Sequence, residues 1–485
     1  MGTIAKIHEM LTTKQCSCVE LTKSYLSEIE KSHAELNAYV NITEEEALKT
    51  AQAVDKKISL GEELGMLEGV PMTLKDNIST KGIETTCCSK MLKGYKPIYN
   101  ATVWDILSKN NAVLLGKTNM DEFAMGSSNE TSCFGVASNP VNTSYVSGGS
   151  SGGVASAVGA NIAPYGLGSD TGGSIRQPAS FCGVVGLKPT YGAVSRFGLV
   201  AFASSLDQIG PITKSVEDAS IVFDAISQQD DKDSTSKGYV GGDTFSKLNN
   251  DIKGMKIGIA RQYLDGLNDD VKEAVLKASE LYKKLGAEIV YFDLTSLKYA
   301  LPAYYIIACA EASSNLGRYD GIRFGYKTES YDSIHDMICR TRSEGFGDEV
   351  KRRILLGTYV LSAGYYDAYY KKAQNLRGTI IKAFDDAFTQ CDVILAPTVP
   401  TTAFKKGDAI TNPVQTYLTD ICTVPVNIAG LPAVSLPCGF DSNGMPIGMQ
   451  LIGKAFGEST ILNVAYKYQQ TASECFKDTK WGVKL

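Results

Sequence analysis

Residues 147–153 read Ser-Gly-Gly-Ser-Ser-Gly-Gly, and residues 168–178 read Gly-Ser-Asp-Thr-Gly-Gly-Ser-Ile-Arg-Gln-Pro. Ser150 and Ser174 lie in these glycine-rich segments, and the region between them carries few charges. Because glycine has no Cβ, such a backbone can approach a ligand closely and point several N–H groups at one spot. Amide hydrolysis needs donors of this kind for the oxyanion, each contributing about 3–4 kcal/mol. Apolar residues follow both segments, so the pattern predicts a hydrolytic site rather than a flexible linker.

The expected base for such a serine is a lysine. A serine hydroxyl is a weak nucleophile at neutral pH and needs a base, but the chain contains only three histidines. A lysine amine becomes neutral near pH 7 only if its surroundings lower its pKa from about 10.4. Lys75 fits because it ends the apolar stretch 70–74 and precedes the turn signal Asp76-Asn77. Alone, a lysine at a strand end is usually a surface residue, and only the two serine segments favour a catalytic interpretation.

Helix and strand patterns alternate along the chain. The first 65 residues predict helices, with a capping box at Ser17 and Glu20. A strand at 255–260, a helix at 269–285 and a strand at 288–292 predict a βαβ unit. The other expected elements are a strand at 69–75, a helix at 102–110, an exposed connection at 228–251, a mainly helical stretch at 300–390, and strands at 393–396, 433–437 and 446–452. This order favours one large α/β domain with α/β/α layers over three independent domains.

The composition excludes several classes of protein. Of 485 residues, 44% are hydrophobic and 21% charged, which is typical of a globular chain with a large core. The net charge is 48 − 53 = −5, whereas a chain that grips a nucleic-acid backbone alone usually has a basic surplus. The twelve cysteines contain no C-x-x-C pair, so we expect free thiols and no metal site. Without a long apolar run or a signal peptide, the chain is expected to be cytoplasmic and not membrane-bound.

Two short motifs suggest other chemistries that their surroundings do not support. Gly116-Lys117-Thr118 matches the end of a phosphate-binding loop, but positions 113–115 are apolar and favour a buried strand. Residues 149–153 match the G-x-S-x-G pattern of α/β-hydrolases, but His335 is the only histidine that follows them. Neither a nucleotide site nor a Ser-His-Asp triad is therefore expected.

Lys75-Asp-Asn and the two glycine-rich segments together resemble the amidase-signature family. The resemblance implies an α/β class, with an amidase-signature α/β/α layered fold and a large mixed central sheet covered by helices. It also implies a single domain over residues 1–485. The expected divisions of that domain are a helical N-terminal segment (1–65), a catalytic core (66–220) and the remainder of the layered fold (221–485).

The same resemblance implies the roles of the catalytic residues. Lys75 would be the base, Ser150 the proton bridge in cis-peptide geometry, and Ser174 the nucleophile. The oxyanion hole would be formed by the backbone N–H groups of Thr171, Gly172, Gly173 and Ser174.

Further motifs resemble one branch of this family, the A subunits of tRNA-dependent amidotransferases. They lie at 119–128, 195–208, 350–354 and 364–370, and the similarity covers residues 3 to 475. The branch implies a glutaminase that supplies ammonia to a B subunit, which uses ATP and Mg²⁺ to convert misacylated Glu-tRNA(Gln) to Gln-tRNA(Gln). A small C subunit would complete the heterotrimer. It further implies that tRNA is bound mainly by the B subunit and that this chain holds no cofactor.

The branch also implies the residues that recognise free glutamine. These are Arg353 for the α-carboxylate, Asp420 for the α-ammonium group and Tyr304 for a further hydrogen bond. On the sequence alone, Arg353 could instead belong to a solvated basic face, Asp420 could cap a turn, and Tyr304 is hard to distinguish from Tyr305. Two alternative functions are a stand-alone amidase that acts on a small free amide and a non-catalytic subunit that keeps only the fold.

Overall fold

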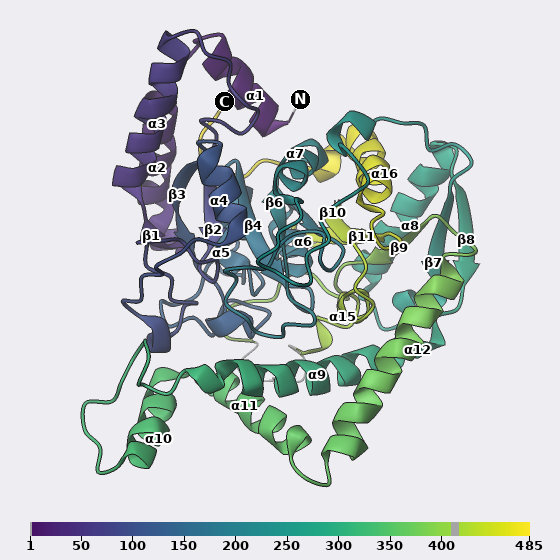
Figure 1. The fold of residues 1–485 in the computed structure, drawn as a ribbon. Helices are drawn as coiled ribbons and strands as arrows, with labels where there is room; N and C mark the ends of the chain where they lie inside the picture. The colour runs from purple at the N-terminus through teal and green to yellow at the C-terminus, as the bar shows by residue number, and fades with distance from the viewer. Residues whose placement is uncertain (1, 409–416) are drawn as a thin grey trace.

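A mixed sheet forms the centre of the computed structural model, which describes residues 2–408 and 417–485 (Figure 1). In the described residues this sheet has eleven strands in the order β1-β3-β2-β4-β6-β5-β10-β11-β9-β7-β8. The strands are β1 (Tyr39–Ile42), β2 (Pro71–Lys75), β3 (Val113–Thr118), β4 (Tyr165–Asp170), β5 (Val185–Lys188), β6 (Gln208–Thr213), β7 (Lys256–Ala260), β8 (Glu288–Phe292), β9 (Val393–Pro397), β10 (Ala433–Phe440) and β11 (Pro446–Ile452). β2 is parallel to β3 and β4, β7 is parallel to β8 and β9, and the other neighbours are antiparallel. The predicted large mixed sheet is confirmed.

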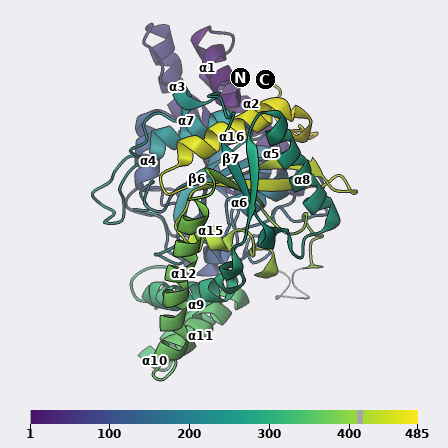
Figure 2. The same ribbon diagram turned by 90° about the vertical axis from the view of Figure 1, so that its right-hand side faces the viewer.

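Helices cover both faces of this sheet. α5 (Gly152–Gly159) and α6 (Arg176–Cys182) pack together on one face, whereas α7 (Val216–Ile226), α8 (Asp269–Lys284) and α16 (Glu458–Thr471) pack on the other. The remaining α-helices are α1 (Thr3–Thr12), α2 (Cys18–Leu36), α3 (Glu44–Ser59), α4 (Thr102–Lys109), α9 (Ala300–Asn315), α10 (Ile334–Gly345), α11 (Asp348–Leu361), α12 (Lys371–Ala387) and α15 (Val424–Ile428). Helices α9 to α12 form a group at one edge of the molecule, in which α9 packs along α11 and α12 (Figures 1 and 2).

Most of the elements predicted from periodicity are present. The βαβ unit consists of β7, α8 and β8, with β7 and β8 parallel, and the stretch from 300 to 390 is mainly helical. The N-terminal segment differs, because β1 lies between α2 and α3 and pairs with β3 at the edge of the sheet. The connection at 228–251 is not simply exposed: Thr244 is fully buried, and its N–H donates to Asp224 Oδ1 on α7 at 3.0 Å.

The parallel pairing of β2 with β4 determines where chemistry can occur. Both strands are buried along their whole length, and Leu74 is paired with Leu167. Because the carboxyl ends of parallel strands lie at the same edge of a sheet, the last residue of β2 and the loop after β4 are brought together. Lys75 and the glycine-rich loop that follows Asp170 therefore meet at one edge.

The structure also shows the state of the cysteines and whether any described helix could span a membrane. All twelve cysteines lie in the described residues, where they are free thiols and eight of them are buried. Among residues 2–408 and 417–485, no helix combines the length and the apolar character that are needed to span a bilayer.

The capping box predicted from the sequence is present at the start of α2. Ser17 Oγ accepts a hydrogen bond from Glu20 N at 3.1 Å, and Ser17 N donates to Glu20 Oε2 at 2.9 Å. We expect Ser17→Ala to lower the free energy of unfolding by about 1 kcal/mol, because the N–H group of Glu20 loses its side-chain partner. Urea-induced unfolding measures this change. Ser27→Ala, at an exposed position inside the same helix, is the matched control and should be neutral or slightly stabilising; equal destabilisation by both variants would contradict the capping role.

Candidate active site

The side chain of Lys75 lies fully buried at the end of β2 and contacts two serines. Its Nζ donates to Ser150 Oγ at 2.7 Å, to Ser169 Oγ at 3.0 Å and to the Ser169 carbonyl at 3.2 Å. Ser150 is also fully buried, and the peptide bond that precedes it, from Gly149, is cis. The structure thus brings together two of the predicted residues, which are 75 positions apart in the sequence.

Ser174 lies in the loop between β4 and α6, next to the segment that carries Ser150. Ser151 N donates to the Ser174 carbonyl at 3.1 Å, which joins the two serine segments through the backbone. The relative exposure of Ser174 is 8%, whereas that of Lys75 and of Ser150 is 0%. Of these three residues, Ser174 is therefore the one that solvent or a ligand can reach.

Burial determines the protonation of Lys75. Removal from water penalises the ammonium form and lowers the pKa of Lys75 to about 7, although Asp121, Asp170 and Asp207 act in the opposite direction. None of these carboxylates forms an ion pair with Lys75 among the described residues, since its Nζ bonds only to serine oxygens there. At neutral pH about half of an amine population with this pKa is neutral and can accept a proton.

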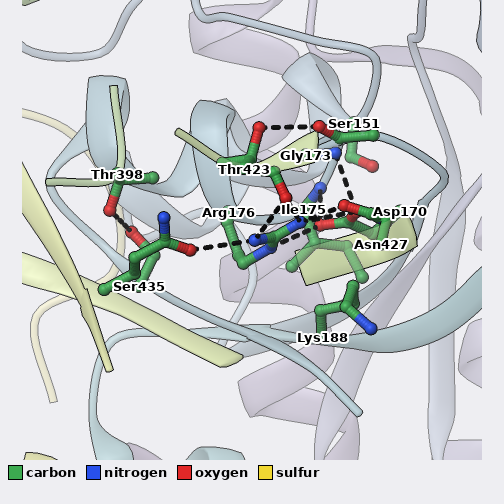
Figure 3. Close-up of polar contacts among 12 residues, drawn as sticks. Ser151, Asp170, Gly173, Ile175, Arg176, Lys188, Thr398, Thr423, Asn427 and Ser435 are labelled. Atoms are coloured by element: carbon green, nitrogen blue, oxygen red, sulfur yellow. Dashed lines mark hydrogen bonds and ion pairs between the residues drawn. The ribbon is translucent and has the colours of Figure 1, made fainter. Parts of the chain in front are cut away.

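The loop after β4 is held by the carboxylate of Asp170 (Figure 3). This group accepts from Gly173 N at 2.8 Å and from Ile175 N at 3.2 Å, and it pairs with Arg176 Nε at 3.0 Å. Burial alone would raise the pKa of Asp170, but the charge and hydrogen bonds of Arg176, with Lys188 and Asn427, together outweigh it and hold the pKa at about 2. The structure therefore differs from the predicted oxyanion hole at Gly173, because the N–H group of this residue is already engaged by Asp170.

Arg176 connects this loop to the C-terminal part of the chain. It is fully buried, and its guanidinium donates to Gln450 Oε1 at 2.9 Å, to the Thr423 carbonyl at 3.2 Å and to Asn427 Oδ1 at 2.5 Å (Figure 3). Thr423 Oγ1 in turn donates to the Gly172 carbonyl at 2.6 Å. The conformation of the loop is thus set by contacts with residues about 250 positions away in the sequence.

Arg353 lies on the buried side of α11. Its relative exposure is 4%, so the alternative of a solvated basic face is wrong for this residue, although Arg352 beside it has a side-chain exposure of 46%. Glu349 Oε1 accepts from Arg353 Nε at 2.8 Å. The rings of Phe202, Tyr305 and Tyr417 surround the guanidinium, with centroids 5.3–5.7 Å from its Cζ. Anchored through Nε, the group can present its two terminal nitrogens to an anion.

Asp420 provides a carboxylate in the same region. It is buried to 8% exposure, and its carboxylate accepts from Ser127 Oγ at 3.2 Å and from the Tyr305 hydroxyl at 3.4 Å. Burial raises the pKa of Asp420 to about 7, while the charge of Arg353 acts to lower it. Its backbone carbonyl, not its side chain, accepts the N–H groups of Thr423 and Val424 in the following turn. The side chain therefore remains available for a ligand.

The two neighbouring tyrosines have different places in this site. Tyr304 is buried against the glycine-rich loop, since a Cβ added to Gly172 would lie 2.6 Å from its hydroxyl oxygen. Tyr305 instead reaches Asp420 with its hydroxyl and Arg353 with its ring. Both tyrosines thus lie at the site, and Tyr304 is the one that contacts the loop of Ser174.

Several residues of the site were missed by the sequence analysis. Gln177 accepts from Gly149 N at 2.9 Å and donates to the Ser127 carbonyl at 2.8 Å, so it joins the Ser150 segment to the Asp420 side. Asp121 N donates to the Ser150 carbonyl at 3.3 Å. Ser127 and Asp121 belong to the segment 119–128, which carried a family resemblance but no assigned role, and Gln177 lies in the quoted stretch 168–178.

The chemistries suggested by the two short motifs would depend on Lys117 and His335. Lys117 is buried in β3 and donates to the Ile78 carbonyl at 2.7 Å, and His335 is exposed on α10. In the part of the chain that the structure describes, no group of three or more His, Cys, Asp or Glu side chains could hold a metal ion.

The chain is similar to known proteins over most of its length. Residues 20–462 match the model of the amidase family. The A subunit of glutamyl-tRNA(Gln) amidotransferase from Caldanaerobacter subterraneus subsp. tengcongensis is 56% identical over 469 residues, which covers 96% of this chain and 96% of that protein.

Two crystal structures have the same fold. That of the A subunit of glutamyl-tRNA(Gln) amidotransferase from Thermotoga maritima has a TM-score of 0.80 and 39% identity, and it covers 96% of this chain and 95% of its own. The peptide amidase from Stenotrophomonas maltophilia has a TM-score of 0.82 and 28% identity, with 99% and 98% covered. The fold is therefore shared by proteins that are named for different amide substrates.

Proposed function

This chain belongs to the amidase family, and we propose that it is the glutaminase subunit of an amidotransferase that converts Glu-tRNA(Gln) to Gln-tRNA(Gln). The observation that carries this proposal is the buried hydrogen bond from Lys75 to Ser150, which lies beside the loop of Ser174. Arg353 and Asp420 add two opposite charges at the same site, as a free amino acid requires.

In the proposed reaction Ser174 is the nucleophile. Its Oγ attacks the side-chain amide carbon of glutamine and passes its proton through Ser150 to the neutral amine of Lys75. The C–N bond then breaks, and the departing nitrogen takes the proton back through the same relay and leaves as ammonia. Water, deprotonated by the relay, cleaves the glutamyl ester, which releases glutamate and restores the Ser174 hydroxyl. Covalent catalysis thus splits one difficult step into two easier ones.

The amides of the glycine-rich loop would stabilise the oxyanion. We assign this role to the N–H groups of Thr171, Gly172 and Ser174, because Gly173 N is bonded to Asp170. By holding that one amide, Asp170 fixes the curvature of the loop and so the direction of the other three. Donors fixed in advance need no reorganisation as the negative charge develops.

The charged residues would select the amino acid. Arg353 would bind the α-carboxylate through its terminal nitrogens, Asp420 would bind the α-ammonium group, and the Tyr304 hydroxyl would contact the substrate beside Gly172. A bound ammonium group would favour ionised Asp420, whose pKa burial raises to about 7. This charged pair favours glutamine over a small uncharged amide, the substrate of the alternative stand-alone amidase.

The ammonia would be used by another protein. Both amidotransferase relatives carry the name of the A component of a larger enzyme. We therefore propose a B subunit that binds the misacylated tRNA, ATP and Mg²⁺, and a small C subunit that completes the heterotrimer. The net charge of −5 agrees with a chain that leaves most tRNA contacts to its partner.

Replacement of Ser174 tests the role in ammonia supply. We expect Ser174→Ala, in the assembled complex, to abolish glutamine-driven amidation of misacylated tRNA while added ammonium still supports it. The ammonium reaction is the internal control for folding and assembly. Loss of both reactions would show that Ser174 is not dedicated to the release of ammonia.

The protonation of Lys75 gives a pH prediction. Labelling of Ser174 by a fluorophosphonate should accelerate as the pH rises through about 7, because only the neutral amine can accept the proton. Lys75→Met should remove this rise and slow labelling by about 100-fold or more. Lys188→Met is the matched control, since Lys188 is also fully buried with its pKa lowered to about 7 but has no proposed role. If Lys188→Met removed the rise and Lys75→Met kept it, the assignment of the base would be wrong.

Replacement of Arg353, on α11, tests recognition of the α-carboxylate. We expect Arg353→Lys to raise the KM for glutamine by about 10-fold or more, since lysine keeps the charge but not the two-pronged geometry. Steady-state ammonia release measures KM and kcat. Lys351→Ala, which removes a cation of the same helix that pairs with Asp348, should leave KM within about twofold. An unchanged KM in Arg353→Lys would reject the carboxylate contact.

A further inference from the structure

Glu122 is a buried carboxylate outside the proposed catalytic set. It lies in the 3₁₀ turn η2 (Glu122–Ala124) with a relative exposure of 3%. Its Oε1 accepts a hydrogen bond from Ser89 Oγ, and its Oε2 accepts from Gly347 N at 2.8 Å. Both carboxylate oxygens thus have partners in segments that are distant in the sequence. A buried carboxylate with this arrangement fixes the position of the groups that it bonds.

The bond to Gly347 holds the start of the helix that carries Arg353. Gly347 is the N-cap of α11, where a negative charge is stabilised by the helix dipole and satisfies a free N–H group. The contact is also close, because a Cβ on Gly347 would lie 2.3 Å from Glu122 Oε2. Arg353 is in the second turn of this helix, so a shift of its first turn moves the guanidinium as well.

The segment of Glu122 also contacts the two other parts of the site. Asp121 donates its N–H to the Ser150 carbonyl at 3.3 Å, and Ser127 donates to the Asp420 carboxylate at 3.2 Å. One short segment therefore touches the catalytic side, the acidic side and, through Glu122, the helix of Arg353. This arrangement can fix the spacing between the two charged groups that would bind an amino acid.

We propose that Glu122 is a positioning residue for glutamine: by anchoring the N-terminus of α11, it holds Arg353 at the distance from Asp420 that the α-carboxylate and α-ammonium groups require. The inference rests on the proposed function. It assigns Glu122 to substrate recognition and not to the transfer of protons, since its carboxylate is committed to Ser89 and Gly347.

Truncation of Glu122 should therefore separate KM from kcat. In ammonia release from glutamine, we expect Glu122→Ala to raise KM by about 10-fold or more while kcat stays within about threefold. The rate of fluorophosphonate labelling of Ser174, which needs no amino-acid recognition, should not change. Glu122→Gln should keep KM within about threefold, because its amide oxygen can accept from Gly347 N and its NH₂ group can donate to Ser89 Oγ.

Two further variants make the test specific. Asp348→Ala removes an exposed carboxylate from the first turn of α11 and should leave KM unchanged, which controls for the loss of charge. Gly347→Ala adds a Cβ that would collide with Glu122 Oε2. It should therefore raise KM as Glu122→Ala does. If Glu122→Ala does not fold, the KM of Gly347→Ala still tests the positioning role.

The possible outcomes distinguish this inference from the proposed function. An unchanged KM in folded Glu122→Ala or Gly347→Ala would overturn the positioning role, and so would a parallel loss of kcat and of Ser174 labelling, which would show a general structural defect. If the wild-type complex released no ammonia from glutamine, the proposed function itself would fail. All variants are compared in the same assembled form as the wild type.

Discussion

The burial of one lysine amine is the constraint on which the rest of this site depends. Lys75 is fully buried, and its Nζ is bonded only to serine oxygens among the described residues. The surrounding carboxylates act on it from a distance, strongly enough to oppose the effect of burial but not to reverse it. A closer aspartate would keep the amine protonated and useless as a base. The β2–β4 pairing places the amine at the edge where Ser150 and the loop of Ser174 arrive, so the fold supplies both the burial and the partners.

A second buried charge network keeps the loop of Ser174 rigid. Arg176 and Asp170 lie in the same glycine-rich stretch, yet the remaining partners of Arg176 come from residues 423 to 450. Glycine gives this loop the freedom to curve, and the ion pair removes that freedom in the folded state. A buried ion pair contributes little net stability, but loss of either partner leaves an uncompensated charge. The network therefore ties the geometry of the loop to correct packing of the C-terminal strands.

The sequence predicts which residues belong to this site better than it predicts the hydrogen bonds between them. Lys75, Ser150 and Ser174 stand in motifs that are recognisable locally, and the helices and strands follow from periodicity. Strand β1 was missed because only four residues form it, and one of them, Ile42, is exposed, so it has no clear pattern. The roles of Gln177 and Glu122 were missed because a hydrogen bond between residues 28 or 225 positions apart leaves no periodic signal. The bond from Gly173 N to Asp170 is local, spanning only three residues, and it was missed because a glycine-rich pattern does not show which amides a neighbouring carboxylate engages.

Burial acts to lower the pKa of both cations of the site, but neighbouring groups outweigh it only at Arg353. Lys75 loses its proton readily because an ammonium ion depends on water for its stability and finds only neutral oxygens in its place. Arg353 is almost as deeply buried, and burial acts to lower its pKa, but Tyr305, Glu349 and Tyr304 together outweigh burial and raise the pKa further above its usual value. A guanidinium spreads its charge and needs less hydration than an ammonium group. A lysine at 353 would keep its charge beside Glu349 but could not offer an anion two parallel N–H groups, and an arginine at 75 could never accept a proton. Lys75 can therefore act as a base and Arg353 as an anion receptor because one is a lysine and the other an arginine, and not only because both are buried.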